Sequence, residues 1–455
     1  MVHESSKPFC VIGAGPAGLA VCRALSQFGI PFECVERESD IGGNFNVANS
    51  RSSVYRSTHL LSSKTMSEFP DFPMPASYPP CPSHTLVLDY FREYARRFRL
   101  NEHISFNTSV ERMEPHSDGW VIEFQNGIRK HYQGVAIANG HHWSPSFPAV
   151  NGELNGKVMH AREYHGPEDF QNKRLLVVGG GNTACDIVAD AVPVASRVFL
   201  SMRRPVHFLP KYSFGNPGDV TLRLMNRLKV PMFVQRFLSS LGARVVNGHP
   251  KTIGLRTPAE RIFDANVTVS SIVPFHIRQG DVVVKPGISA LDGDQVSFTD
   301  GTRENIDVVV YATGYQLTFP FIDAAHLNSS GGGVPDLYLR QFHPDRDDVA
   351  VVGMIHAAYG GSWPLMYLQA QLLARFWAAR QQSCNIDWFR RLKTEPSPDL
   401  SGGYAKLAAK RQQLSVEPVR FSKHLQSLIR RFDQRCEIQP LEASNDSRTS
   451  IQRAA

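Results

Sequence analysis

Cysteine is sparse and unpaired in this chain of 455 residues. Seven cysteines stand at positions 10, 22, 34, 81, 185, 384 and 436, and no Cys-x-x-Cys pattern occurs. An odd count without paired spacing predicts free thiols in a reducing compartment. The same absence excludes a reductase that works through a redox-active dithiol. We expect Cys10, Cys22, Cys34 and Cys185 to be small core residues.

Long apolar runs and blocks of like charge are also missing. No apolar stretch reaches the ~18 residues of a membrane-spanning helix, and residues 1–7 lack the apolar segment of a signal peptide. The net charge is only +7, without the dense Lys/Arg block of a nucleic-acid binder. We therefore expect a cytoplasmic protein with no transmembrane segment, no nucleic-acid partner and no metal site. Residues 436–455 are polar and aperiodic, which predicts a disordered tail.

A glycine fingerprint near the amino end indicates a dinucleotide site. Gly13-Ala14-Gly15-Pro16-Ala17-Gly18 follows an apolar run and opens a segment with helical spacing. Gly13 permits the tight turn, Gly15 lets the backbone approach a pyrophosphate, and Gly18 lets the helix pack on the strand. A second strand ends at Glu36, whose carboxylate suits a ribose diol and repels a 2′-phosphate. A plain glycine turn is the alternative, but all the flanking elements fit a site for FAD or NAD.

A second fingerprint carries the opposite charge. Gly179, Gly181 and Ala184 take the three glycine positions, with Asn182 and Thr183 between them, and the helix is expected to end before Pro193. The following strand ends in Arg203 and Arg204 instead of an acid. Two guanidinium groups suit a 2′-phosphate through charge-assisted bonds, so this segment predicts NADPH. Two solvated surface arginines are the alternative.

The later part of the chain alternates strands and helices. Residues 307–315 are predicted to form a buried strand that ends in a Gly-containing turn, and 364–380 a helix with an apolar stripe. The segment 223–241 is amphipathic and basic, and Pro231 is expected to kink or split it. A membrane-surface or substrate-lid role is open for this segment, but packed, partly buried helices are the favoured interpretation.

Several motifs together resemble the flavin-containing monooxygenases, over about residues 9–381. Residues 154–164 are similar to the family signature FxGxxxHxxxY, with Leu154 in place of Phe. Residues 179–187 are similar to GxGNSGxDIA, and Ala312-Thr313-Gly314-Tyr315 to the ATGY turn. The segment Ile41-Gly42-Gly43-Asn44-Phe45 matches a glycine pair near the flavin, with Phe45 in place of the usual Trp. Residues 64–73 resemble K-x4-F-x-DFP, and 364–369, ending in Gln369, resemble P-x4-Q.

The resemblance implies a fold, two cofactors and a reaction. The expected α/β fold has two Rossmann-like dinucleotide-binding domains, with an NADPH domain (147–314) inserted into a discontinuous FAD domain (1–146 and 315–435). The implied enzyme passes a hydride from NADPH to FAD, forms a C4a-hydroperoxyflavin with O2, and oxygenates an amine nitrogen or sulfide sulfur of a small-molecule substrate. A homodimer is expected by family analogy alone. His160 of the signature is interpreted as a hydrogen-bonded structural histidine.

One departure from the family pattern concerns the reactive region. The family usually has an Asn three residues before the lysine equivalent to Lys64, close to the reactive edge of the flavin, and this chain has Leu61. Loss of that donor would cost about 10²–10³ in rate if the amide stabilised a transition state. His59, Ser62 and Ser63 are the polar candidates for a replacement, so Leu61, Lys64 and His59 mark the expected catalytic region. Baeyer–Villiger oxygenation of a ketone, an uncoupled NADPH oxidase and a flavin-bearing interaction protein remain alternatives.

Overall fold

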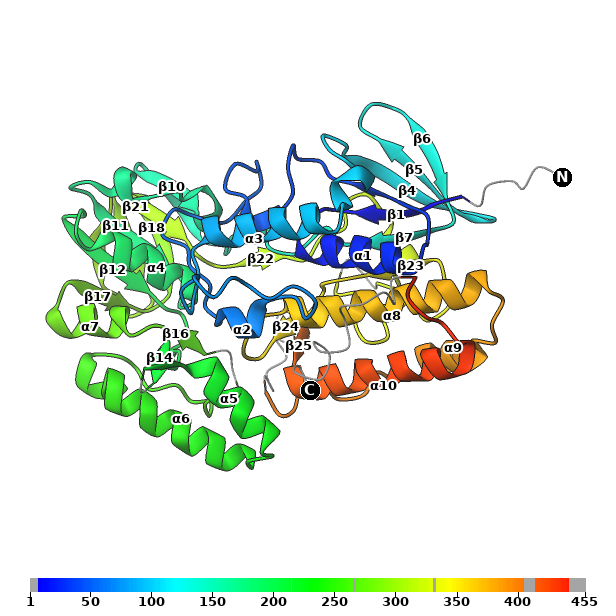
Figure 1. Ribbon diagram of the computed structural model, residues 1–455. Helices are drawn as coiled ribbons and strands as arrows, with labels where there is room; N and C mark the ends of the chain where they lie inside the picture. Colours follow the sequence, from blue (N-terminus) through cyan, green and yellow to red (C-terminus); the bar gives the residue numbers. More distant parts are fainter. Residues whose placement is uncertain (1–6, 214, 265–266, 330–332, 405–413, 442–455) are drawn as a thin grey trace.

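Two parallel sheets form the framework of the protein (Figure 1). The computed structural model describes residues 7–213, 215–264, 267–329, 333–404 and 414–441. The first sheet has the order β23-β7-β1-β2-β3. Its strands are β1 (Phe9–Ile12), β2 (Phe32–Val35), β3 (Ile104–Ser105), β7 (Gly134–Ile137) and β23 (Val349–Val351).

The second sheet repeats this plan with the order β10-β21-β11-β12-β17. Its strands are β10 (Lys157–His160), β11 (Arg174–Val178), β12 (Arg197–Ser201), β17 (Val282–Lys285) and β21 (Val308–Tyr311). In each sheet the strand before a glycine fingerprint, β1 or β11, lies between a neighbour that follows it directly and one that comes later in the chain. Ligands of parallel α/β sheets bind at the carboxyl ends of the strands at such a reversal of strand order.

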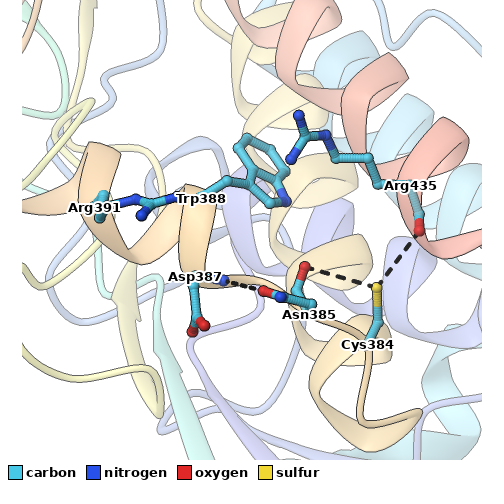
Figure 2. A pocket seen from close by; sticks show the side chains of 6 residues that line it. All are labelled: Cys384, Asn385, Asp387, Trp388, Arg391 and Arg435. Atoms are coloured by element: carbon cyan, nitrogen blue, oxygen red, sulfur yellow. Dashed lines mark hydrogen bonds between the residues drawn. The ribbon is translucent and has the colours of Figure 1, made fainter.

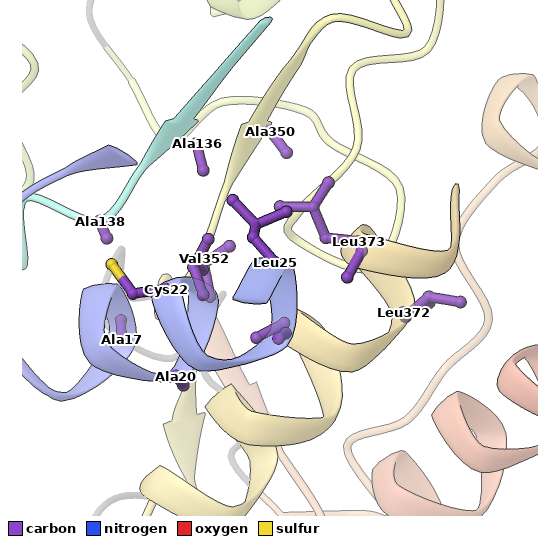
Figure 3. Packing of buried hydrophobic residues seen from close by; sticks show 14 of the residues in the cluster. Ala17, Ala20, Cys22, Leu25, Ala136, Ala138, Ala350, Val352, Leu372 and Leu373 are labelled. Carbon is purple, nitrogen blue, oxygen red and sulfur yellow. The ribbon is translucent and has the colours of Figure 1, made fainter. Parts of the chain in front are cut away.

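Helices cover one face of each sheet. In the first half these are α1 (Pro16–Gln27), α3 (His84–Arg97) and α8 (Trp363–Gln381); in the second they are α4 (Asn182–Ala191) and α7 (Ile272–Gln279). The helix of the second fingerprint therefore ends before Pro193, as predicted. On the first sheet, small side chains such as Ala20 and Cys22 of α1 and Ala136 of β7 pack closely, and Leu372 of α8 belongs to the same cluster (Figure 3). The Trp377 ring of α8 stacks on Phe9 of β1 at 4.0 Å between centroids.

Smaller sheets cover the opposite faces. The first is formed by β4 (Val110–His116), β5 (Gly119–Phe124) and β6 (Arg129–Tyr132); the second by β9 (Asn151–Leu154), β18 (Ile288–Gly293), β19 (Gln295–Phe298) and β20 (Arg303–Asn305). Successive residues of a strand point to opposite faces. Thus Leu175 and Val177 of β11 pack under the helices, whereas Leu176 packs under the smaller sheet.

Shorter elements complete the described chain. The remaining helices are α2 (Lys64–Ser67), α5 (Gly218–Arg227), α6 (Met232–Asn247), α9 (Asp387–Thr394) and α10 (Pro418–Cys436). The short strand pairs are β8 (Ser144–Pro145) with β22 (Tyr315–Gln316), β13 (Phe208–Leu209) with β16 (Thr268–Val269), β14 (Tyr212–Ser213) with β15 (Asn216–Pro217), and β24 (His356–Ala357) with β25 (Ser415–Val416). Within the described ranges, the chain has no helix with the length and apolarity to cross a membrane.

Pro231 splits the 223–241 segment into α5 and α6, as predicted, and stands directly before α6. The expectation that these helices are packed and partly buried is confirmed on one side, where half-buried Leu222 and Met232 pack against a buried cluster, but several of their large apolar side chains are exposed. Among the described residues of α5 none is buried, and α6 buries only Gln235 and Asn247.

The prediction that the cysteines are free thiols is wrong for one pair. Cys384 and Cys436 form a disulfide, with their Cα atoms 5.7 Å apart. The two cysteines are 52 residues apart in sequence. Packing of α10 against α8 brings the turn after α8 next to the end of α10, and spacing along the chain carries no sign of this. Figure 2 shows Cys384 beside Trp388 and Arg435 in a surface hollow. That hollow lies beyond the carboxyl end of α8.

The prediction of a disordered tail from residue 436 is wrong for residues 436–441. Cys436 ends α10, Ile438 is buried, and the Leu441 amide donates to the Gln27 carbonyl at 2.8 Å. Residues 436–441 are therefore ordered by contacts with the first half of the protein. The rest of the predicted tail, 442–455, lies outside the described residues.

The disulfide predicts a redox-dependent stability. Closing a 52-residue loop stabilises the fold by about 4 kcal/mol in the chain-entropy account. We expect dithiothreitol to lower the Tm of the wild type and to leave the Tm of Cys436→Ser unchanged. Cys81→Ser, which alters a buried free thiol, should respond to dithiothreitol like the wild type. Equal reductant effects on the wild type and Cys436→Ser in differential scanning calorimetry would contradict the pairing.

Candidate functional site

The first fingerprint forms a turn that only glycine fits. Gly13 has φ = +102°, and a Cβ atom there would lie 2.7 Å from the Ala138 carbonyl oxygen. A Cβ on Gly18 would lie 1.7 Å from the Gly13 carbonyl oxygen. These contacts join β1, α1 and the end of β7 without space for side chains, so this turn depends on both glycines.

A second glycine segment closes on this turn from outside. Gly43 has φ = +53°, and a Cβ there would approach the Gly15 Cα at 3.0 Å. Gly15 is the N-cap of α1, where backbone amides lack helical partners and attract anions. Asn44 is fixed because its Oδ1 accepts bonds from the Ser53 amide (2.8 Å) and hydroxyl (2.9 Å), and Phe45 packs against Trp363. The predicted residues 43–45 thus lie beside the predicted glycine turn.

Glu36 sits at the end of β2 next to the turn and is buried. One carboxylate oxygen accepts from the Ala14 amide at 2.6 Å, and the other accepts from the Glu38 amide at 3.0 Å. Burial raises the pKa of Glu36, and these two backbone bonds oppose that rise. Each oxygen retains acceptor capacity for a ribose hydroxyl.

The second fingerprint repeats the geometry of the first. Gly179 has φ = +139°, and a Cβ there would lie 2.5 Å from the carbonyl oxygen of Ala312, the residue that follows β21. In the same turn, Thr313 donates its hydroxyl to the Ser146 carbonyl, and the Gly314 carbonyl accepts from the Ser146 amide at 3.0 Å. In both halves the first glycine of the fingerprint thus packs on a carbonyl at the end of a neighbouring strand.

Gly181 differs from the other fingerprint glycines because no atom lies within 4 Å of its constructed Cβ. It caps α4, and the next residues, Asn182 and Thr183, begin that helix. The Asn182 Oδ1 accepts from the Val269 amide at 2.8 Å, which fixes the side chain against β16. The helix terminus therefore opens onto free space, as an approaching pyrophosphate requires.

Three arginines surround the loop after β12. The predicted Arg203 and Arg204 are exposed. Arg256 was missed by sequence reasoning, and its guanidinium donates to the Met202 carbonyl at 2.8 Å and the Arg203 carbonyl at 3.4 Å. Arg256 stands 52 positions after Arg204 and outside any motif, so only the fold shows that it belongs to this loop.

Hydroxyl–carboxylate bonds connect the two halves. Tyr55 donates to Asp186 of α4 at 2.6 Å, and Ser57 donates to Asp190 at 2.5 Å. Tyr164 of the signature donates to the same Asp190 carboxylate at 2.7 Å. Burial and the Asp186 charge raise the pKa of Tyr55 far above its usual range, so the phenol keeps its proton. The segment around Tyr55, which follows the first glycine site in the chain, is thereby fixed to the second.

His160 is fully buried and acts as a connector. Its Nδ1 accepts from the Arg162 amide at 3.1 Å, so Nε2 carries the hydrogen that points to the Gly314 carbonyl at 3.1 Å. Burial lowers the pKa of His160, which favours this neutral form. These contacts favour the structural role expected for the histidine.

Leu61 lies in the loop before α2 and is 42% exposed. The nearby hydroxyl hydrogens are already engaged: Ser67 donates to the Ser63 carbonyl, so Ser62 donates to the Ser67 oxygen at 2.7 Å, and Ser63 donates to Asp219 at 3.0 Å. The His59 Nδ1 faces the Ser57 carbonyl at 2.9 Å. Neither Ser62 nor Ser63 therefore replaces the amide donor that Leu61 lacks.

Lys64, a predicted catalytic residue, forms a structural link. The Lys64 ammonium donates to the carbonyls of Pro75, Ala76 and Tyr78 at 2.9, 3.0 and 2.6 Å. An ammonium has three donors, so none is left for a reacting group. This placement argues against the predicted catalytic role of Lys64.

Gln369 acts indirectly on the first site. It is fully buried, and its Oε1 accepts from the Gly353 amide at 3.2 Å. Gly353, which sequence reasoning missed, has φ = +87°, and a Cβ there would lie 2.9 Å from the Ala17 Cβ of α1. The sequence signal for Gly353 was a glycine that follows a buried strand. Its contact with Ala17 brings a third segment of backbone close to the first fingerprint.

No metal site was predicted, but one cluster of possible metal ligands lies on the described surface. His116, Asp118 and His131 come together on the sheet that β4, β5 and β6 form, and all three are exposed. The Lys7 ammonium pairs with Asp118 at 2.6 Å. The cluster lies apart from the contacts that build either glycine site.

Comparison with known proteins gives one consistent result. A family model described as flavin-binding monooxygenase-like matches residues 6–384. A dimethylaniline monooxygenase [N-oxide-forming] 2 of Mus musculus is 32% identical over 400 residues, covering 82% of this chain and 73% of its own. Among solved structures, the S-allyl-L-cysteine S-oxygenase of Allium sativum aligns with a TM-score of 0.61 at 19% identity over 96% and 90% of the two chains. A cyclohexanone-bound cyclohexanone monooxygenase aligns with a TM-score of 0.70 at 15% identity over 94% and 98%.

The glycine contacts predict opposite outcomes for two alanine substitutions. Gly18→Ala introduces a Cβ at 1.7 Å from a carbonyl, so we expect loss of bound flavin and of the cooperative unfolding transition. Gly181→Ala meets no protein atom, so we expect a folded, flavin-loaded protein with a KM for NADPH raised about tenfold or more, because the methyl obstructs the pyrophosphate. Flavin absorbance, calorimetry and steady-state kinetics measure both. A flavin-loaded Gly18→Ala protein, or an unchanged KM in Gly181→Ala, would contradict the assignment.

Proposed function

Because the chain belongs to the flavin-binding monooxygenase-like family, we propose that it uses FAD and NADPH to insert one oxygen atom of O2 into a soft nucleophile, an amine nitrogen or a sulfide sulfur. Residues 1–146 and 315–435 are assigned to FAD and 147–314 to NADPH. The nucleophile class is supported by the activities for which two similar proteins are named, an N-oxide-forming dimethylaniline monooxygenase and an S-oxygenase.

The observation that carries this proposal is the pair of matched glycine turns. Each has a first glycine with positive φ packed on the carbonyl at the end of a neighbouring strand, and each opens a helix amino end. The first turn has a buried acid, Glu36, and the second has exposed arginines. This difference in charge supports an unphosphorylated ribose at one site and a 2′-phosphate at the other.

The residues at the first site fit FAD. Gly15 and Gly43 leave backbone surface without side chains, which a pyrophosphate can approach, and Glu36 can accept from the ribose. When bound, the flavin would supply hydride acceptance and oxygen activation, the chemistry for which the chain offers no side-chain constellation. The chain itself would bind both dinucleotides, and the Tyr55–Asp186 bond would keep their sites in register.

A second candidate function is an uncoupled NADPH oxidase, and Leu61 favours it. An alkyl side chain cannot donate a hydrogen bond, and the hydroxyl hydrogens of Ser62 and Ser63 are engaged elsewhere. An oxidase would return O2 as hydrogen peroxide without an oxygenated product. The two functions differ in where the electrons of NADPH go.

The decisive experiment follows those electrons. The flavin-loaded protein is supplied with NADPH, O2 and, in turn, N,N-dimethylaniline, a dialkyl sulfide and a cyclic ketone. Oxygenated amine or sulfide that accounts for most of the NADPH consumed supports the proposal. Stoichiometric hydrogen peroxide with every substrate supports the oxidase, and lactone from the ketone alone assigns the enzyme to ketone oxygenation.

The arginine loop predicts the nicotinamide preference. Replacing both Arg203 and Arg204 with Gln removes two charged donors, each worth about 1.5–3 kcal/mol, so the ratio of kcat/KM for NADPH over NADH should fall by about 10²–10⁴. The loss should appear for NADPH and not for NADH. Arg112→Gln, on the sheet of the other half, changes net charge without touching this loop and should leave the ratio unchanged.

Leu61 predicts a gain of coupling. We expect Leu61→Asn to raise the yield of oxygenated product per NADPH, with a rate gain of up to about 10² if the restored amide donates in the transition state. Leu61→Ser tests a shorter donor, and Leu61→Val is the matched apolar control. If Leu61→Asn and Leu61→Val give the same product and peroxide yields, position 61 does not control oxygen transfer.

A further inference from the structure

Three side chains that can bind a metal ion lie together on the small sheet formed by β4, β5 and β6, at one end of the molecule (Figure 1). They are His116, Asp118 and His131, and we call them the histidine cluster. Met113 and Tyr132 are buried on the inner face of this sheet. Because side chains alternate between the two faces of a strand, His116 of β4 and His131 of β6 point away from the protein.

The register of the sheet brings the two imidazoles close to each other. Val121 of β5 pairs with Glu114 of β4 on one side and with His131 of β6 on the other. His116 is the next outward residue of β4 after Glu114. The His116 ring lies 5.0 Å from the His131 ring between centroids, with the ring planes at 83°. The sheet thus holds both nitrogen ligands on one rigid surface.

Asp118 adds a carboxylate from the tight turn between β4 and β5. Its Oδ1 lies 2.6 Å from the His116 Nδ1, and its Oδ2 accepts from the Lys7 ammonium at 2.6 Å. A carboxylate that binds a metal through one oxygen is oriented by a hydrogen bond to the other. Lys7 stands just before β1, so this bond also ties the turn to the first sheet. The ammonium charge repels a cation, which keeps the affinity below that of a closed structural site.

The ligand set fits zinc. Two imidazole nitrogens and one carboxylate oxygen are a set that proteins use for Zn²⁺, with water in the fourth position. Each bond to the metal is about 2.0–2.2 Å long, so the ligand atoms of a tetrahedral site lie about 3.4 Å apart. The ligand atoms of the histidine cluster all lie within 4.8 Å of one another, and the three side chains are exposed. Rotations about their χ angles therefore bring the ligand atoms together without moving the strands.

Few other groups compete for such an ion. Within the described ranges, no other three His, Cys, Asp or Glu side chains bring their ligand atoms this close together. The five free cysteines are buried, and Cys384 and Cys436 are joined in the disulfide. Glu114, which shares the outer face of the sheet, is paired with Arg112 at 2.6 Å. The histidine cluster is therefore the place on the described surface where one ion finds three protein ligands.

We propose that His116, Asp118 and His131 bind one Zn²⁺ ion, with water completing its coordination. The ion joins the turn after β4 to β6 across β5, and it acts as a clamp on the sheet that covers the first parallel sheet. The site shares no residue with either glycine turn, so the inference does not rest on the proposed function. A plain chain of surface ion pairs, from Lys7 through Asp118 to His116, is the alternative.

The test is isothermal titration of the untagged, flavin-loaded protein with ZnCl₂, after treatment with EDTA and gel filtration. His116→Gln and His131→Gln each remove one ligand, and His116→Gln/His131→Gln removes both. His103→Gln, which alters an exposed histidine of the same half, is the matched control. Flavin content verifies that each variant is folded. Pulsed electron paramagnetic resonance of the protein with one equivalent of Cu²⁺ counts the imidazole ligands.

We expect one Zn²⁺ ion per chain for the wild type and for His103→Gln. Each single variant at the site should weaken the affinity by more than about tenfold, and the double variant should show no saturable binding. The Cu²⁺ spectra should show two imidazole ligands in the wild type and one in His131→Gln. A wild type without saturable zinc binding overturns the inference. So does a one-to-one zinc site that the double variant retains, or a Cu²⁺ spectrum that His131→Gln leaves unchanged.

Discussion

The structure depends most on the hydroxyl–carboxylate bonds between its two halves. Tyr55 and Ser57 follow the first glycine site in the chain, yet they bind Asp186 and Asp190 on the helix that opens the second site. Tyr55 also packs in the hydrophobic cluster of the second half. Each parallel sheet could bind a dinucleotide alone. Transfer between two dinucleotides requires that their sites keep a fixed separation, and these bonds provide that restraint.

Local chemistry made much of the framework predictable. A glycine fingerprint between a buried strand and a helix depends on residues close in sequence, so the turns at Gly13 and Gly179 follow directly from the chain. The helix end before Pro193 and the break between two helices at Pro231 were predictable for the same reason, because proline removes a backbone donor. The charge contrast between Glu36 and the arginine pair Arg203–Arg204 was likewise visible, since each stands at the end of its strand.

Features that depend on tertiary packing could not be predicted from the spacing of residues along the sequence. Arg256 joins the second site from a distant segment, and Gly353 reaches α1 from the last strand of the first sheet. The disulfide depends on α10 lying along α8. The periodicity of α6 showed an apolar stripe without showing which side the protein covers, and buried Gln235 and Asn247 decide that it faces outward. The three donors of Lys64 were engaged by a loop that no motif predicts.

The proposed function requires that a nicotinamide and a flavin meet between the two sheets, and anaerobic reduction tests this most directly. The flavin-loaded protein is mixed with NADPH and then with NADH in the absence of O2, and the visible absorbance of the bound flavin is followed. We expect complete bleaching by NADPH, much faster than by NADH. Protein that binds no flavin, or flavin that stays oxidised with excess NADPH, would contradict it.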